Sequence, residues 1–110
     1  MKDERVYLLH VLDSMVRIMD YTRGGKKAFL GDTKTQDAVV RNLEIIGEAV
    51  KNMSSSLKSK YPDIPWKRMA GMRDKMIHDY FGVNLDIVWD VVERDIPVLK
   101  RGIEAILKTL

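Results

Sequence analysis

Apolar residues recur at helical spacing in four segments of the chain, which cover residues 3–21, about 33–57, about 66–80 and about 84–110. The stripe positions are Leu8, Val11, Leu12, Met15, Ile18 and Met19 in the first segment, and Val39, Leu43, Ile46, Val50, Met53 and Leu57 in the second. In the third they are Met69, Met72 and Met76, and in the fourth Val88, Val91 or Val92, Ile96, Leu99, Ile103, Ile106 and Leu110. No segment shows sustained alternation with period two, so no strand is expected. The pattern predicts an all-α fold, an antiparallel bundle of four main helices with short connections.

The first connection contains Arg23-Gly24-Gly25-Lys26-Lys27. The two glycines favour a helix end there. The three cationic side chains could bind phosphates, but we interpret the stretch as a solvated basic loop. Asp32, Thr33 and Thr35 then offer N-caps for the second helix. Its sequence predicts that it continues to about residue 57, with residues 54–56 in its frayed end.

The second connection, residues 61–66, contains two prolines and ends at Trp66. We expect an extended link whose indole ring closes one end of the bundle. Gly82 is expected to end the third helix, and Asn84 to cap the fourth. Pro97 should kink the last helix or split it in two, because proline lacks the amide N–H that an inner helical turn requires.

Composition limits the class of protein. The chain has 110 residues, 45% hydrophobic and 32% charged, so a single helix-rich domain spanning residues 1–110 is expected. It contains no cysteine and only two histidines, which argues against thiolate chemistry and a structural metal site. The apolar runs are too short for a membrane span and residues 1–5 do not resemble a signal peptide, so we expect a cytoplasmic protein. The formal charge of +3 permits contact with RNA without requiring it.

Candidate chemistry is concentrated in residues 72–80, which bring together Arg73, His78 and Tyr80. Histidine can move protons near neutral pH, and arginine can neutralise phosphoryl oxygens, so the pair suits cleavage of a phosphodiester without a metal. Five residues separate them, however, which places them roughly 140° apart around a helix. Either Arg73 wraps around the helix, or a second helix or subunit completes the site. Asp74 shares a face with His78 and could orient its ring.

Two other polar groups have open interpretations. The second helix carries a dense polar set around Gly47, namely Asp37, Arg41, Asn42, Glu44 and Glu48. This set is either a solvated face with intrahelical ion pairs, such as Asp37 with Arg41 or Glu48 with Lys51, or a brace for the site at residues 72–80. His10 lies on the polar side of the first helix and is interpreted as a solvated surface histidine.

Taken together, three stretches resemble the HepT-like ribonuclease toxins of the HEPN superfamily. They are residues 37–49 (DAVVRNLEIIGEA), residues 61–66 (YPDIPW) and residues 71–80 (GMRDKMIHDY), and the similarity covers essentially the whole chain. The last stretch contains the family's R-x4-H-x-Y motif as Arg73, His78 and Tyr80, with a polar residue, Asp74, after the arginine.

The resemblance implies a HEPN-like bundle that forms a homodimer and cleaves RNA without a metal or cofactor. Arg73 and His78 would be the catalytic residues, and Asp74 and Tyr80 would support them at a cleft between two subunits. It also implies a toxin whose partner is a minimal nucleotidyltransferase antitoxin that inhibits it by transferring AMP onto Tyr80. The alternative is a non-catalytic helical dimer that binds a nucleotidyltransferase or a nucleotide.

Overall fold

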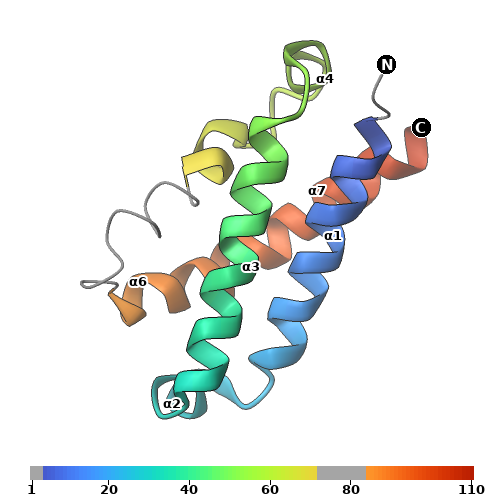
Figure 1. The fold of residues 1–110 in the computed structure, drawn as a ribbon. Coiled ribbons are helices and arrows are strands. Elements are labelled where there is room, and N and C mark those ends of the chain that lie inside the picture. The colour runs from blue at the N-terminus through green and yellow to red at the C-terminus, as the bar shows by residue number, and fades with distance from the viewer. Residues whose placement is uncertain (1–3, 72–83) are drawn as a thin grey trace.

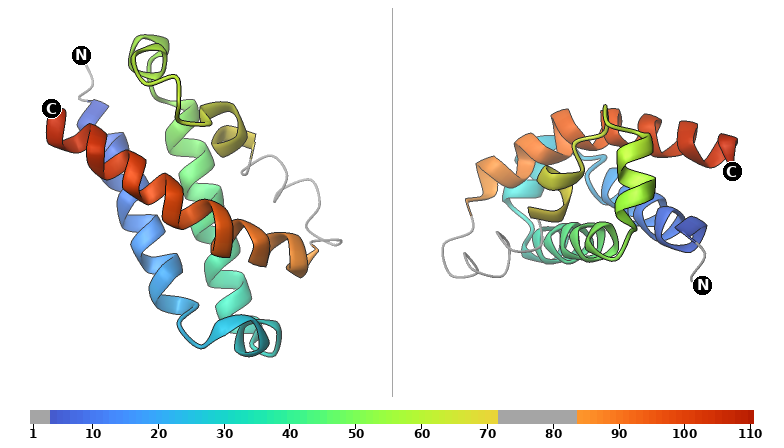
Figure 2. Two further views of the ribbon diagram at one scale, coloured as in Figure 1. Left: turned by 180° about the vertical axis from the view of Figure 1, so that it is seen from behind. Right: turned by 90° about the horizontal axis from the view of Figure 1, so that it is seen from above.

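A computed structural model describes residues 4–71 and 84–110 of the chain. Three long helices dominate it: α1 (Glu4–Tyr21), α3 (Thr33–Lys51) and α7 (Ile96–Thr109). Helices α1 and α3 run antiparallel and side by side, and α7 crosses them obliquely on one face (Figures 1 and 2). The described residues contain helices and no strand, which confirms the all-α prediction. The four-helix arrangement stays a prediction, because part of the expected third helix lies outside the described residues.

The core lies between these three helices, where the predicted stripes meet. Its fully buried large side chains are Leu8, Val11, Met15 and Ile18 of α1, Val39, Leu43, Ile46 and Val50 of α3, Ile96 and Ile103 of α7, and Phe29 and Met69 from shorter elements. Burying one such side chain contributes about 1.5–3 kcal/mol. The stripes therefore specify which helix faces pack together.

The expected basic loop at residues 23–27 is only partly a loop. Gly25 begins a short helix, α2 (Gly25–Leu30), and adopts a φ of 88°, which an L residue rarely tolerates. Phe29 of α2 is buried in the core, and Lys26 forms an ion pair with Asp86 at 3.2 Å. The tertiary contacts of Phe29 explain why this glycine-flanked stretch is helical.

The predicted end of the second helix near residue 57 is wrong, since α3 ends at Lys51. Ser54, expected inside that helix, is instead the N-cap of a separate helix, α4 (Ser55–Lys60), and its hydroxyl accepts a hydrogen bond from the Leu57 N–H at 3.1 Å. The Glu4 carboxylate accepts bonds from the Ser54 N–H and hydroxyl. These contacts with α1 stabilise the break. At its start, α3 is capped by Asp32, as predicted.

Pro97, which the sequence predicted to kink or split the last helix, instead follows a π-helical turn in a segment that stays helical from Leu85 to Thr109. The segment begins as α6 (Leu85–Asp90), widens into a π-helical turn η2 (Val91–Asp95) and continues as α7. The Ile96 N–H bonds to the Val91 carbonyl five residues back. Because the proline ring crowds the carbonyl four residues before it, a wider turn immediately ahead of Pro97 relieves that contact.

Trp66 is buried, but the second connection is not the extended link that the sequence predicted, because residues 61–64 form a turn in which the Ile64 N–H donates to the Tyr61 carbonyl. The Trp66 side chain is 8% exposed, and its indole N–H donates to the carbonyls of Lys58 at 3.1 Å and Tyr61 at 3.0 Å. The Tyr61 hydroxyl in turn bonds to Thr109 of α7 at 2.8 Å. Within residues 4–71 and 84–110, no helix has the length and apolarity needed to cross a membrane.

Candidate functional site

The residues predicted to carry the chemistry, Arg73, Asp74, His78 and Tyr80, lie outside the residues that the structure describes. Their roles therefore stay predictions. The structure does show how the chain is held immediately before this segment, at residues 66–71, and immediately after it, from Asn84. It also shows the helix α3 that the sequence offers as a brace.

Before the segment, residues 66–71 are helical. Their first turn is anchored by the buried Trp66 and by Met69, whose N–H donates to the Pro65 carbonyl at 3.0 Å and whose side chain is fully buried. Arg68 reaches the last residue of η2, with 2.7 Å between its Nη2 and Oδ2 of Asp95. The Asp95 side chain is 16% exposed but that of Arg68 is 66% exposed, so solvent still screens this pair in part.

After the segment, Asn84 caps α6 by accepting hydrogen bonds from the N–H groups of Asp86 and Ile87. Asp86 and Trp89 of α6 then contact α2. Asp86 forms the ion pair with Lys26, and the Trp89 ring lies against Phe29 of α2, with 5.5 Å between ring centroids. Buried side chains and ion pairs thus hold the chain on both sides of residues 72–83.

The polar set on α3 is not entirely a solvated face. Arg41 is exposed and pairs with Glu44 at 3.6 Å, where the sequence predicted Asp37. Asn42 and Gly47, in contrast, are buried. The Asn42 amide nitrogen donates to the Ala38 carbonyl at 2.8 Å, and among the described residues its Oδ1 has no donor. Buried amide oxygens normally accept a hydrogen bond, so the unpaired Asn42 Oδ1 is unusual. Part of the polar set on α3 is therefore buried and does not belong to a solvated face.

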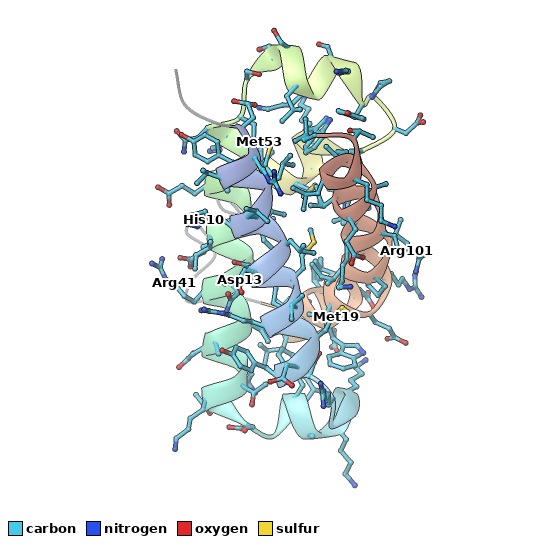
Figure 3. All side chains as sticks on the ribbon, turned by 90° about the vertical axis from the view of Figure 1, so that its right-hand side faces the viewer. His10, Asp13, Met19, Arg41, Met53 and Arg101 are labelled. Carbon is cyan, nitrogen blue, oxygen red and sulfur yellow. The ribbon has the colours of Figure 1, made fainter. Side chains whose placement is uncertain are left out.

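A second polar site lies in the groove between α1 and α3, where sequence reasoning had placed none. A cavity of about 260 Å³ is lined by Val6, Tyr7, His10, Ile45, Glu48, Ala49 and Asn52. His10 is exposed, as predicted, and Figure 3 shows it on the flank of α1 next to α3. The lining residues come from two segments about forty positions apart in the sequence, so no local sequence pattern predicts the site. The only signal in the sequence is a polar residue at the edge of each stripe.

The ionisable groups of the described residues offer little else. The one resolved pKa shift belongs to Asp32, whose pKa is lowered because its carboxylate accepts a hydrogen bond from the Thr35 hydroxyl and further bonds from backbone N–H groups. No three histidine or acidic side chains of residues 4–71 and 84–110 gather as metal ligands.

Comparison with known proteins gives a family match over most of the chain. The family model described as "Ribonuclease HepT-like" matches residues 11–106, which include residues 72–80. A protein of Methanocaldococcus jannaschii named "Putative RNase MJ0127" is 48% identical over 99% of this chain and 91% of its own length. "Probable ribonuclease HepT" of Thermococcus cleftensis is 45% identical over 97% of this chain and 98% of its own length. No solved structure matches the chain.

Proposed function

This chain belongs to the HepT-like ribonuclease family, and from that membership we propose that it is a metal-independent endoribonuclease acting as the toxin of a toxin–antitoxin pair. The observation that carries the proposal is the family match across residues 11–106, because that range contains Arg73, His78 and Tyr80 in the R-x4-H-x-Y spacing. We expect the enzyme to act on RNA in the cytoplasm.

In the proposed reaction, the ribose 2′-OH attacks the adjacent phosphorus and the bond from phosphorus to the 5′-oxygen breaks. The products are a cyclic phosphate on one fragment and a 5′-hydroxyl on the other. His78 transfers a proton during this step, and Arg73 stabilises the extra negative charge on the pentacoordinate phosphorus. Tyr80 contacts the scissile phosphate, and Asp74 orients the imidazole.

We further propose that the active enzyme is a homodimer. Arg73 and His78 lie roughly 140° apart around a helix, so one chain does not readily aim both at the same phosphate. A two-fold axis can bring the arginine of one subunit towards the histidine of the other. The burial of Trp66 and Met69 before the segment and of Trp89 after it supports this arrangement, since a site shared between subunits needs a rigid scaffold.

Control of the toxin is proposed to act through Tyr80. A minimal nucleotidyltransferase antitoxin would transfer AMP from ATP to the tyrosine hydroxyl, with release of pyrophosphate. The product places a bulky anion two residues from His78, where it blocks the cleft and competes with RNA for Arg73.

The direct test mixes the purified protein with single-stranded RNA in EDTA and measures the cleavage rate. Removing the proton-transfer group in His78→Ala should slow cleavage by roughly 10²–10⁴-fold, and Arg73→Ala by about 10²-fold or more. Arg101→Ala, which removes an exposed arginine on α7, is the matched control and should cleave at the original rate. Unchanged cleavage in both motif variants would end the proposal.

The competing function is a non-catalytic dimer that binds a nucleotidyltransferase or a nucleotide. Expression in a host cell separates the two, because a nuclease should arrest growth and a passive binding module should not. Co-expression with the neighbouring gene should relieve the arrest. The intact mass of the co-expressed protein should then increase by one or more AMP units, and Tyr80→Phe should prevent the increase at that residue.

A further inference from the structure

The cavity between α1 and α3 lies across α3 from the described elements that flank residues 72–83. Residues 66–71 and α6, which hold that segment, are on one side of α3, and α1 is on the other (Figures 1 and 2). The cavity holds about 260 Å³, slightly less than the usual range for drug-sized ligands. It therefore suits a side chain or a small molecule with one polar head. Its binding role would be separate from RNA cleavage.

The lining of this cavity accepts hydrogen bonds and carries negative charge. Among the residues that the structure describes, Glu48 is the only carboxylate in the lining, and no lysine or arginine lines it. The amide nitrogen of Asn52 already donates to the Glu48 carbonyl at 2.9 Å, so the Asn52 Oδ1 is left as an acceptor. Tyr7 adds a phenol and His10 adds an imidazole to the polar part of the lining.

Within the part of the chain that the structure describes, the Glu48 carboxylate lacks the internal partner that three other acidic groups of α1 and α3 have. Asp13, Asp20 and Glu44 each form an ion pair within their own helix or the adjoining turn. Glu48 is exposed, and its carboxylate has no hydrogen bond or ion pair to any residue of the described ranges. An unpaired carboxylate over an apolar floor is available to a cation from outside the chain.

We propose that this cavity binds the head of an extended alkyl cation, a guanidinium or ammonium group, supplied by a basic side chain of another protein or by a free polyamine. The donors of such a group match the acceptors of Glu48 and Asn52. The Tyr7 ring offers a face for cation–π attraction. Val6, Ile45 and Ala49 cover the aliphatic stem, as apolar surface does for long basic side chains. A phosphate is disfavoured, because it would face the Glu48 carboxylate without a cation.

The experiment titrates the full 110-residue protein with two cationic probes, N-acetyl-arginine methylamide and spermidine, and follows backbone amide signals by NMR. N-acetyl-citrulline methylamide, which has the arginine shape without the charge, is the neutral control probe. The proposal expects saturable shifts at Tyr7, His10, Glu48 and Asn52 with a cationic probe and much weaker shifts with the citrulline probe.

Two variants make the test specific. Glu48→Gln removes the charge at an exposed position and should weaken cation binding roughly tenfold or more. Asp37→Asn removes an exposed carboxylate on the same helix outside the cavity and should leave binding unchanged. Thermal unfolding of both variants at the original midpoint shows that the fold is intact.

The outcomes separate the two sources and the rival chemistry. Saturation by the arginine probe alone supports a basic side chain of a partner, and saturation by spermidine alone supports a polyamine. Binding of neither cation up to about 20 mM, equal binding of the citrulline probe, or full binding by Glu48→Gln would each overturn the proposal. Shifts of the same amides by guanosine that persist in Glu48→Gln would overturn it in favour of a nucleobase site.

Discussion

Replacing Trp66 with phenylalanine should destabilise the fold by a calculable amount. The indole is 8% exposed and holds the link between α4 and residues 66–71, so it supports the chain immediately before the proposed catalytic segment. Phenylalanine keeps an aromatic ring in the same place but removes the N–H donor. The substitution therefore measures the loss of the hydrogen bond and of the extra ring area, without the large cavity that Trp66→Ala would leave.

Two contributions set the magnitude. The N–H is shared between two carbonyls, and each keeps a backbone donor after the change, since Tyr61 N–H bonds to Lys58 O and Ile64 N–H bonds to Tyr61 O, both at 3.2 Å. The loss is thus about 1 kcal/mol, without the larger penalty of an unpaired buried acceptor. The indole also buries roughly 40 Å² more apolar area than a phenyl ring, worth about 1 kcal/mol. The free energy of unfolding should fall by about 2 kcal/mol.

Urea unfolding followed by far-UV circular dichroism measures this change without relying on tryptophan fluorescence, which the substitution alters. With an m value of about 1–3 kcal/mol/M, the midpoint should move down by about 1 M. Trp89→Phe is the matched control. Trp89 is equally buried, but its N–H donates to the carboxylate of the exposed Glu93 at 2.8 Å, which water can solvate after the change. It should lose only about 1 kcal/mol.

Hydrogen exchange adds a local measurement to the global one. The amide of Met69, bonded to the Pro65 carbonyl, should exchange faster in Trp66→Phe than in Trp89→Phe. A loss below about 0.5 kcal/mol in Trp66→Phe, or equal losses in the two variants, would refute the reasoning. The hydrogen bonds of the Trp66 indole would then not be what stabilises the connection between α4 and residues 66–71.

Three further predictions concern single local features. Asn84→Ala removes the N-cap acceptor of α6 and should cost about 1 kcal/mol in chemical unfolding, whereas Asn84→Asp should be nearly neutral. Gly102→Ala places a Cβ 2.5 Å from Cδ1 of Ile64, which is the end of a flexible side chain. The cost of this clash should roughly cancel the gain of about 1 kcal/mol in helix propensity, so the melting temperature should change little. A melting temperature lowered by more than about 8 °C would contradict this. The pKa of Asp32 is lowered in the folded state, so its capping contribution should be present above the unfolded value of 3.8 and disappear as pH falls through the folded value. Asp32→Asn, which keeps an acceptor that does not titrate, should show a smaller acid-dependent rise in amide exchange at Lys34 and Thr35, and an equal rise would count against the cap.

Local sequence signals predicted those elements whose formation depends on neighbours along the chain. The 3.6-residue periodicity of α1 and α3 placed Leu8, Val39 and Ile46 in the core, and Asp32 and Asn84 cap the helices they precede. The roles of Arg73 and His78 also come from the sequence alone, because motif spacing and family membership require no coordinates. Their relative placement stays a prediction.

Tertiary structure decided the features that depend on residues far apart in the chain. Ser54 looked like the interior of a helix, but Glu4, fifty residues earlier, bonds to its N–H and hydroxyl where a new helix begins. The cavity formed because Tyr7 and His10 of α1 meet Glu48 and Asn52 of α3, and each residue alone is typical of a polar helix edge. Local periodicity records which side of a helix is apolar, whereas only the packing of two helices determines which polar residues face each other across a groove.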